Sequence, residues 1–162
     1  MKTIPEIVNF FNDNKIFIIT ENRPFFTFAD IKKQINWIKV FFTNQKILKT
    51  DTIAIVLENG SEMASCFLSV VSNCCVAPLN PSYTQFEFDY YLNDLNPKAI
   101  IVSENSNSSI INVARKNKIK IFKLSYNNND VSGKFILKSE ESYNDILNGK
   151  NIEIFPNDTA LI

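Results

Sequence analysis

The stretch DTIAIVLENGSEMASCFLSVVSNCCVAPL, residues 51–79, decides the fold. Asp51–Leu57 is a near-continuous apolar run bounded by polar residues, which is typical of a strand buried on both faces. A polar turn follows, and Ser61 is the predicted N-cap of a helix that is apolar over much of its girth. Cys75–Leu79 then predicts a second buried strand. A strand, a helix and a strand with short connections indicate a right-handed crossover between parallel strands.

The segment before this stretch predicts a helix packed on the sheet. Thr27 is its predicted N-cap, and Asp30, three residues later, makes a weak form of the capping box. The apolar positions recur at steps of three and four and form one stripe: Phe28, Ile31, Ile35, Ile38 and Phe42. The stripe is shorter than three heptads, which favours packing on a sheet over a coiled coil.

The segment after it predicts another helix and another strand. Thr84 and Glu87 form a full capping box at the start of the helix. We expect Phe86, Tyr90 and Leu95 to face inward, flanked by Phe88 and Tyr91. Lys98–Val102 predicts the next buried strand.

The remaining segments continue the alternation. The predicted helices are Ile4–Phe11, one holding Ile110, Ile111 and Ala114, and a short one from Ser139 to Leu147. The predicted strands are Ile16–Thr20, Pro24–Thr27, Ile119–Leu124 and Lys134–Leu137, with a polar loop at Asn127–Gly133, a turn at residues 157–159 and the start of a strand at residues 160–162. The fold class is therefore α/β, a doubly wound parallel sheet.

The composition excludes several kinds of chemistry. The chain has no histidine, which removes the commonest general base and metal ligand, and only three glycines, which excludes a glycine-rich phosphate loop. Seventeen basic and seventeen acidic residues cancel, so neither nucleic acid nor an anionic membrane is an expected partner. The uncharged run Met63–Leu79 is too short for a membrane span, and the start of the chain does not read as a secretion signal.

Several groups of residues could form a site, and for each the structural interpretation is favoured. Asn59–Ser61 could bind an anion at a helix start, although one glycine wraps phosphate poorly. The other groups are an aromatic set (Phe86, Phe88, Tyr90, Tyr91), a basic set (Arg115, Lys116, Lys118, Lys120, Lys123), the carboxylates Glu140 and Glu141, the turn Pro78–Tyr83, and three cysteines expected in the core (Cys66, Cys74, Cys75). We assign no catalytic, cofactor-binding or metal-binding residue.

Three stretches carry a resemblance to a known family: TFADIKKQINWI (27–38), DTIAIVLENGSEMASCFLSVV (51–71) and APLNPSYTQFEFDYYLNDLNPKAIIV (77–102). In order and spacing they resemble the first subdomain of the AMP-dependent synthetase and ligase superfamily, which forms acyl-adenylates. PLNPSY followed by EF-x-YYL-x-D is closest to oxalate-CoA ligase-like enzymes. The last stretch, PNDTALI (156–162), resembles the segment just before the family's phosphate-binding loop.

The resemblance implies a two-step reaction in which a carboxylate attacks the α-phosphorus of ATP and CoA then displaces AMP. ATP, Mg²⁺ and CoA are the implied cofactors of a full-length member, in fatty acid or dicarboxylate metabolism, and none is assigned to this chain. We expect residues 1–162 to be the first part of such a domain, truncated before the phosphate loop and inactive alone.

Two alternatives stay open. One is a non-catalytic α/β interaction module derived from such an enzyme, whose partner would be the missing remainder or a full-length relative. The other, a stand-alone nucleotide-binding domain, is disfavoured by the scarcity of glycine. The expected location is cytoplasmic or peroxisomal and not secreted, and the acyl substrate is left undetermined.

Overall fold

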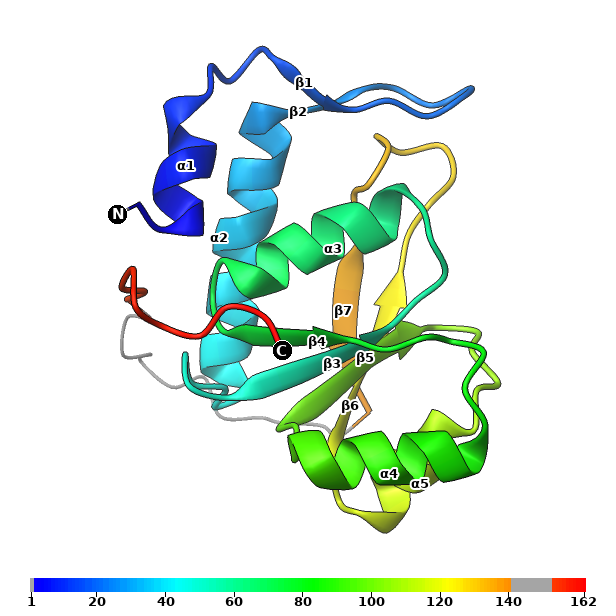
Figure 1. Cartoon of the computed structure of the whole chain (residues 1–162). Coiled ribbons are helices and arrows are strands. Elements are labelled where there is room, and N and C mark those ends of the chain that lie inside the picture. The colour runs from blue at the N-terminus through cyan, green and yellow to red at the C-terminus, as the bar shows by residue number, and fades with distance from the viewer. Residues whose placement is uncertain (1, 141–152) are drawn as a thin grey trace.

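The computed structural model describes residues 2–140 and 153–162, and a mixed sheet lies at its centre (Figure 1). The strand order is β4–β3–β5–β6–β7. The strands are β3 (Thr52–Val56), β4 (Cys75–Pro78), β5 (Ala99–Ser103), β6 (Lys120–Ser125) and β7 (Ile136–Ser139). The first four run parallel, and β7 pairs antiparallel with β6. The α/β prediction is thus confirmed, with an antiparallel strand at one edge.

Helices cover both faces of this sheet, as Figure 1 shows. On one face lie α2 (Phe28–Asn44) and α3 (Ser61–Val71), and on the other α4 (Gln85–Leu95) and α5 (Ile110–Lys116). Alternation along β3 explains the two layers, because Ile53 and Ile55 join the core under α2 and α3, whereas Ala54 and Val56 join the core under α4 and α5. Both faces are apolar, which is why the sequence of this strand is a continuous apolar run.

A smaller layer lies at the amino-terminal end of the chain. It consists of α1 (Ile4–Phe10) and a two-stranded hairpin of β1 (Ile16–Ile18) and β2 (Phe26–Thr27). These elements pack on the first turns of α2 through a third apolar cluster built on Val8, Phe26, Phe28 and Ile31. The predicted strands here exist but are shorter than expected.

The helix starts confirm two predicted caps and correct the third. Thr27 and Thr84 each form a complete capping box, with Asp30 and Glu87 respectively. The prediction that Ser61 is an N-cap was wrong, because Gly60 takes that position and Ser61 is the first residue of α3. The Ser61 hydroxyl donates to the Glu62 carboxylate at 2.8 Å, so it does not accept from the backbone of the first turn.

The inward face of α4 also differs from the prediction. Phe86 and Tyr90 are 82% and 62% exposed, whereas Phe88 and Leu92 are buried. Phe88 and Leu92 are four residues apart and contact the sheet together, so the buried stripe is rotated from the one predicted. Four of the eleven residues of α4 are aromatic, so the sequence does not single out one apolar stripe.

The carboxyl-terminal predictions have mixed outcomes. Ser139 ends β7 and does not start a helix, and the rest of the helix predicted up to Leu147 lies outside the described residues. Leu161 forms an isolated parallel bridge with Val76 of β4. Two backbone hydrogen bonds support it, from Val76 N to the Ala160 carbonyl at 3.0 Å and from Ile162 N to the Val76 carbonyl at 3.1 Å. The predicted strand start at residues 160–162 therefore lies beside the edge of the sheet.

The apolar run Met63–Leu79 folds as the end of α3 followed by β4, as predicted. Among the helices that the structure describes, none has both the length and the apolarity that a membrane crossing requires.

Candidate functional site

The carboxyl ends of β3 and β5 form the natural place for a ligand. These strands are neighbours, but the chain leaves β3 for β4 on one side and leaves β5 for β6 on the other. Open α/β sheets bind ligands in the crevice outside such a switch point. Residues 57–60 and 104–109 are the loops at this position. The structure thus places the predicted anion site at Asn59–Ser61 on the edge at which open α/β sheets bind ligands.

Glu62, one residue further along, is the centre of a hydrogen-bonded network at this edge. Its Oε1 atom lies 2.7 Å from Arg23 Nη1 and accepts from Gly133 N at 3.0 Å. Arg23 also donates to the carbonyls of Asp130 at 3.2 Å and Val131 at 3.0 Å. The Arg23 and Glu62 side chains are only 12% and 13% exposed. The network therefore joins the hairpin turn, the start of α3 and the loop before β7.

Serine hydroxyls extend the same network. Ser65 Oγ donates to the Gly133 carbonyl, and Ser132 donates to the Pro24 carbonyl through both its backbone N–H and its hydroxyl, each at 3.0 Å. Gly133 has a left-handed backbone, with φ of 85°, and a Cβ there would lie 3.0 Å from Ile18 Cδ1 and 3.1 Å from the Ser61 carbonyl. Only glycine fits this position without strain.

The electrostatics show what this network does. Burial raises the pKa of Glu62, but hydrogen bonds from Ser61, Arg23 and Gly133 outweigh it and hold the pKa below its ordinary value. Glu62 is thus a carboxylate in the first turn of α3, where the helix dipole favours a negative charge. The chain's own carboxylate supplies the negative charge at this helix start, which supports the structural interpretation of Asn59–Ser61.

A hollow of about 330 Å³ lies nearby, at the ends of β5 and β6. Glu104, Tyr126, Asp130 and Lys134 contribute side chains to it. Its charges are paired, because Lys134 lies 2.7 Å from Asp130 and Glu104 lies 3.4 Å from Lys138. Paired surface charges offer little binding energy to a ligand.

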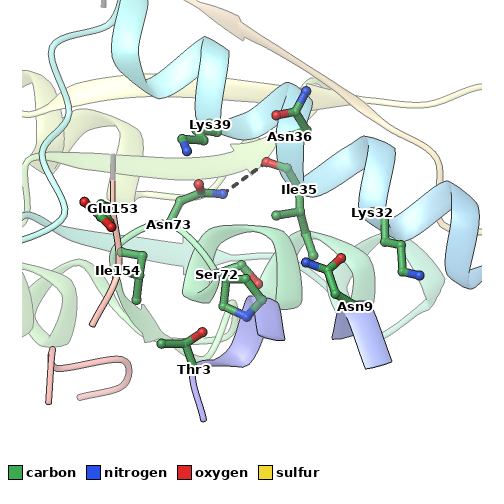
Figure 2. Close-up of a pocket in the computed structure, with 11 residues that line it drawn as sticks. Thr3, Asn9, Lys32, Ile35, Asn36, Lys39, Ser72, Asn73, Glu153 and Ile154 are labelled. Carbon is green, nitrogen blue, oxygen red and sulfur yellow. Dashed lines mark hydrogen bonds between the residues drawn. The ribbon is translucent and has the colours of Figure 1, made fainter. Parts of the chain in front are cut away.

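A larger cavity, of about 420 Å³, lies between α1, α2 and the end of α3 (Figure 2). Asn73 is buried, and its carboxamide donates to the carbonyls of Ile35 at 3.2 Å and Ser69 at 2.8 Å. Lys39 and Glu153 also line the cavity. Asn73 comes just before β4, so the cavity opens at the amino end of the strands, opposite the edge at which α/β sheets bind ligands.

The aromatic set does not form one surface. Phe88 is in the core, Phe86 points to solvent, and Tyr91 stacks on Tyr83 with ring centroids 5.0 Å apart. Tyr83 is the last residue of the predicted turn Pro78–Tyr83, and together with Leu79 it packs on the core under α4 and α5. These contacts favour the structural interpretation of the turn.

Four of the five side chains of the basic set contact polar neighbours. Arg115 and Lys123 lie 3.1 Å and 3.6 Å from Glu140, and Lys116 lies 3.2 Å from Asp89. Lys120 Nζ donates to the Gln45 carbonyl at 2.7 Å. Glu140 thus forms ion pairs with two residues of the basic set, and Glu141 lies outside the described residues.

The cysteines are buried and free, as predicted, and burial raises the pKa of the Cys66 and Cys74 thiols. Within residues 2–140 and 153–162 no three Cys, Asp or Glu side chains are placed to hold a metal ion. The sequence analysis missed Arg23, Glu62 and Gly133. Glu62 is 39 residues from Arg23 and 71 residues from Gly133, and no local sequence pattern indicates contacts over such separations.

The sequence comparisons agree with this architecture. The AMP-binding enzyme family model matches residues 9–162. The oxalate–CoA ligase of Saccharomyces cerevisiae is 36% identical over 98 residues, which are 56% of this chain and 18% of that protein. The oxalate–CoA ligase of Arabidopsis thaliana is 36% identical over 70 residues, 43% of this chain and 14% of that protein. The matches thus span less than a fifth of either relative.

Solved structures share the fold. Apo MatB from Rhodopseudomonas palustris has a TM-score of 0.66 at 20% identity, over 75% of this chain and 25% of that one. A benzoate CoA ligase from Burkholderia xenovorans has a TM-score of 0.67 at 12% identity, over 81% and 27%. Since the family model covers nearly all of its length, the chain belongs to the AMP-binding enzyme family.

Proposed function

We propose that this chain is the amino-terminal part of an AMP-forming acyl-CoA ligase. The whole enzyme would activate a carboxylate as an acyl-adenylate and pass the acyl group to CoA, with ATP and Mg²⁺ as cofactors. The observation that carries the proposal is the family match over residues 9–162, together with two oxalate–CoA ligases at 36% identity. Oxalate, or a similarly small dicarboxylate, is the first substrate to test. The proposal locates the enzyme in the cytoplasm or the peroxisome.

Within that enzyme, residues 1–162 act as scaffold. Phosphoryl chemistry needs backbone donors, a cation and Mg²⁺ around the phosphates. The three glycines are dispersed along the chain, and Gly133 serves the loop before β7. Arg23 is bound to Glu62 and two carbonyls, and is not free to bind phosphate. The groups that react with ATP would come from the remainder of the enzyme, which is also the proposed partner of this chain.

A second candidate is a non-catalytic interaction module of the same fold. The exposed aromatic side chains Phe86 and Tyr90 on α4 favour it, because such side chains are common at protein interfaces. In this case the chain would bind a partner without completing an active site.

A chimera separates the two candidates. The segment of the S. cerevisiae oxalate–CoA ligase that aligns with this chain is replaced by residues 1–162, and oxalate-dependent AMP formation is measured. We expect activity in the chimera and none from the 162-residue chain with Mg·ATP, CoA and oxalate. A matched chimera with Gly133→Val should lose activity through misfolding. AMP formation by the chain alone would overturn the scaffold role, and a folded but inactive chimera would favour the interaction module.

A further inference from the structure

The pair Asn59–Gly60 lies in the turn after β3, and its exposure favours a reaction between the Asn59 side chain and the backbone. Both residues are exposed in the turn before α3. Gly60 has an extended backbone, with φ of 167° and ψ of −176°, and nothing lies within 4 Å of the position that a Cβ would take. No neighbouring atom therefore crowds Gly60 on the side where a Cβ would stand.

We propose that Asn59 is a site of spontaneous deamidation. The Gly60 amide loses its proton to a base, and the nitrogen attacks Cγ of Asn59. The new N–Cγ bond closes a cyclic imide while the Cγ–Nδ2 bond breaks, and ammonia leaves after taking a proton from water. Water then adds to either ring carbonyl, and the ring opens to aspartate or to isoaspartate.

Hydrogen bonding at the pair supports this reaction. In the part of the chain that the structure describes, neither the Gly60 N–H nor the Asn59 carboxamide forms a hydrogen bond. The Gly60 carbonyl accepts from Ala64 N at 3.0 Å. The helix therefore fixes the carbonyl of Gly60, while its amide nitrogen stays free to react. An N–H that donates to a carbonyl is harder to deprotonate.

Asn105 provides a comparison within the same chain. It is exposed in the loop after β5, at the same edge of the sheet. Its successor Ser106 carries a side chain, and the Ser106 N–H donates to the Ser103 carbonyl at 3.0 Å. Both features oppose attack by the backbone nitrogen, so Asn105 should react more slowly than Asn59.

The product has an electrostatic consequence at the switch point. Deamidation adds one carboxylate just ahead of α3, where the helix dipole favours negative charge. It also places this charge close in sequence to Glu62, on a chain whose formal net charge is zero. The carboxyl edge of the sheet would thus become more acidic as the protein ages.

Peptide mass spectrometry tests the proposal. The full chain is incubated in neutral and in mildly alkaline buffer, and conversion of each asparagine to aspartate or isoaspartate is followed over time. We expect faster conversion at Asn59 than at Asn105, with a rate that rises with pH. Asn148–Gly149, which lies outside the described residues, is measured on a separate peptide.

Gly60→Ala is the matched control. The extended backbone accepts alanine and the Cβ meets no atom, so the variant should fold while conversion at Asn59 falls several-fold. Circular dichroism verifies the fold. If the variant fails to fold, Asn59→Gln provides the second comparison and should remove the early mass change from that peptide. Conversion at Asn59 no faster than at Asn105, or unaffected by Gly60→Ala, would overturn the proposal.

Discussion

The two ends of the parallel strands are built differently. At the carboxyl end, Arg23 and Glu62 pair in a largely buried position and connect three segments that are distant in sequence. At the amino end, the cavity of Figure 2 is lined by polar side chains such as Lys39 and Asn73, and Asn73 donates to the carbonyls of Ile35 and Ser69. The difference indicates that the edge expected to meet a ligand is the rigid one, whereas the open cavity is peripheral to the fold.

Of the variants that test this difference, Arg23→Ala should lose the most free energy of unfolding. Arg23→Ala leaves Glu62 and two carbonyls without their donor, and we expect a loss of about 3 kcal/mol in the free energy of unfolding. Urea denaturation measures it. Lys32→Ala breaks a partly exposed pair with Asp13 and a hydrogen bond to the Phe11 carbonyl beside the cavity, and as the control it should cost less than the Arg23 variant, about 1 kcal/mol. Equal losses in the two variants would contradict the contrast between the ends.

Glycine substitutions at the carboxyl end give the next effect. Gly133→Ala forces a side chain into a left-handed backbone and against Ile18 and the Ser61 carbonyl. A loss of about 2 kcal/mol is expected. Gly60→Ala should change the free energy of unfolding by less than about 1 kcal/mol, because the site is open and extended. Urea midpoints that shift equally would show that Gly133 is not constrained.

The pH dependence of stability sharpens the same point. The pKa of Glu62 in the folded chain is below its ordinary value of 4.5, so its contribution to stability is present above that pH and is lost as the pH falls through the folded pKa. Glu62→Gln should flatten the decline of the unfolding free energy below about pH 4.5. Urea titrations of both proteins across this range measure it. Parallel curves would mean that another carboxylate controls acid sensitivity.

The smallest effect is expected at the cavity. Among the residues that the structure describes, no carboxylate forms an ion pair with the Lys39 ammonium, so Lys39→Ala should alter the unfolding free energy by no more than about 0.5 kcal/mol. Asn73→Ala removes two hydrogen bonds to carbonyls and should cost about 1 kcal/mol or more. A large loss from Lys39→Ala, measured in the same urea assay, would make the amino end as structured as the other.

Much of the fold could be predicted from the sequence, because local patterns determine it. Continuous apolar runs identified β3 and β5, and the capping boxes at Thr27 and Thr84 identified the starts of α2 and α4. The inward face of α4 was predicted wrongly, since its apolar positions are too many to single out one stripe. The antiparallel direction of β7 depends on the path of the loop that connects it to β6, and no sequence pattern predicts that path.

The candidate site was less predictable. The sequence predicted that Asn59–Ser61 lies where a strand meets a helix, but the contacts there join residues brought together only by folding. A salt bridge between residues 39 positions apart leaves no periodic signal. Arg23 looked like an ordinary turn residue, and the left-handed backbone of Gly133 depends on the loop around it.

The order of strands also bears on synthesis. β3 pairs with β4 on one side and with β5 on the other, and both partners follow it in the chain. A growing polypeptide that has just completed β4 therefore has β3 with one edge open until residues 99–103 emerge from the ribosome. An open edge of Ile and Val residues readily pairs with other chains. During the interval between β4 and β5, one edge of this central strand is thus open to pairing with other chains.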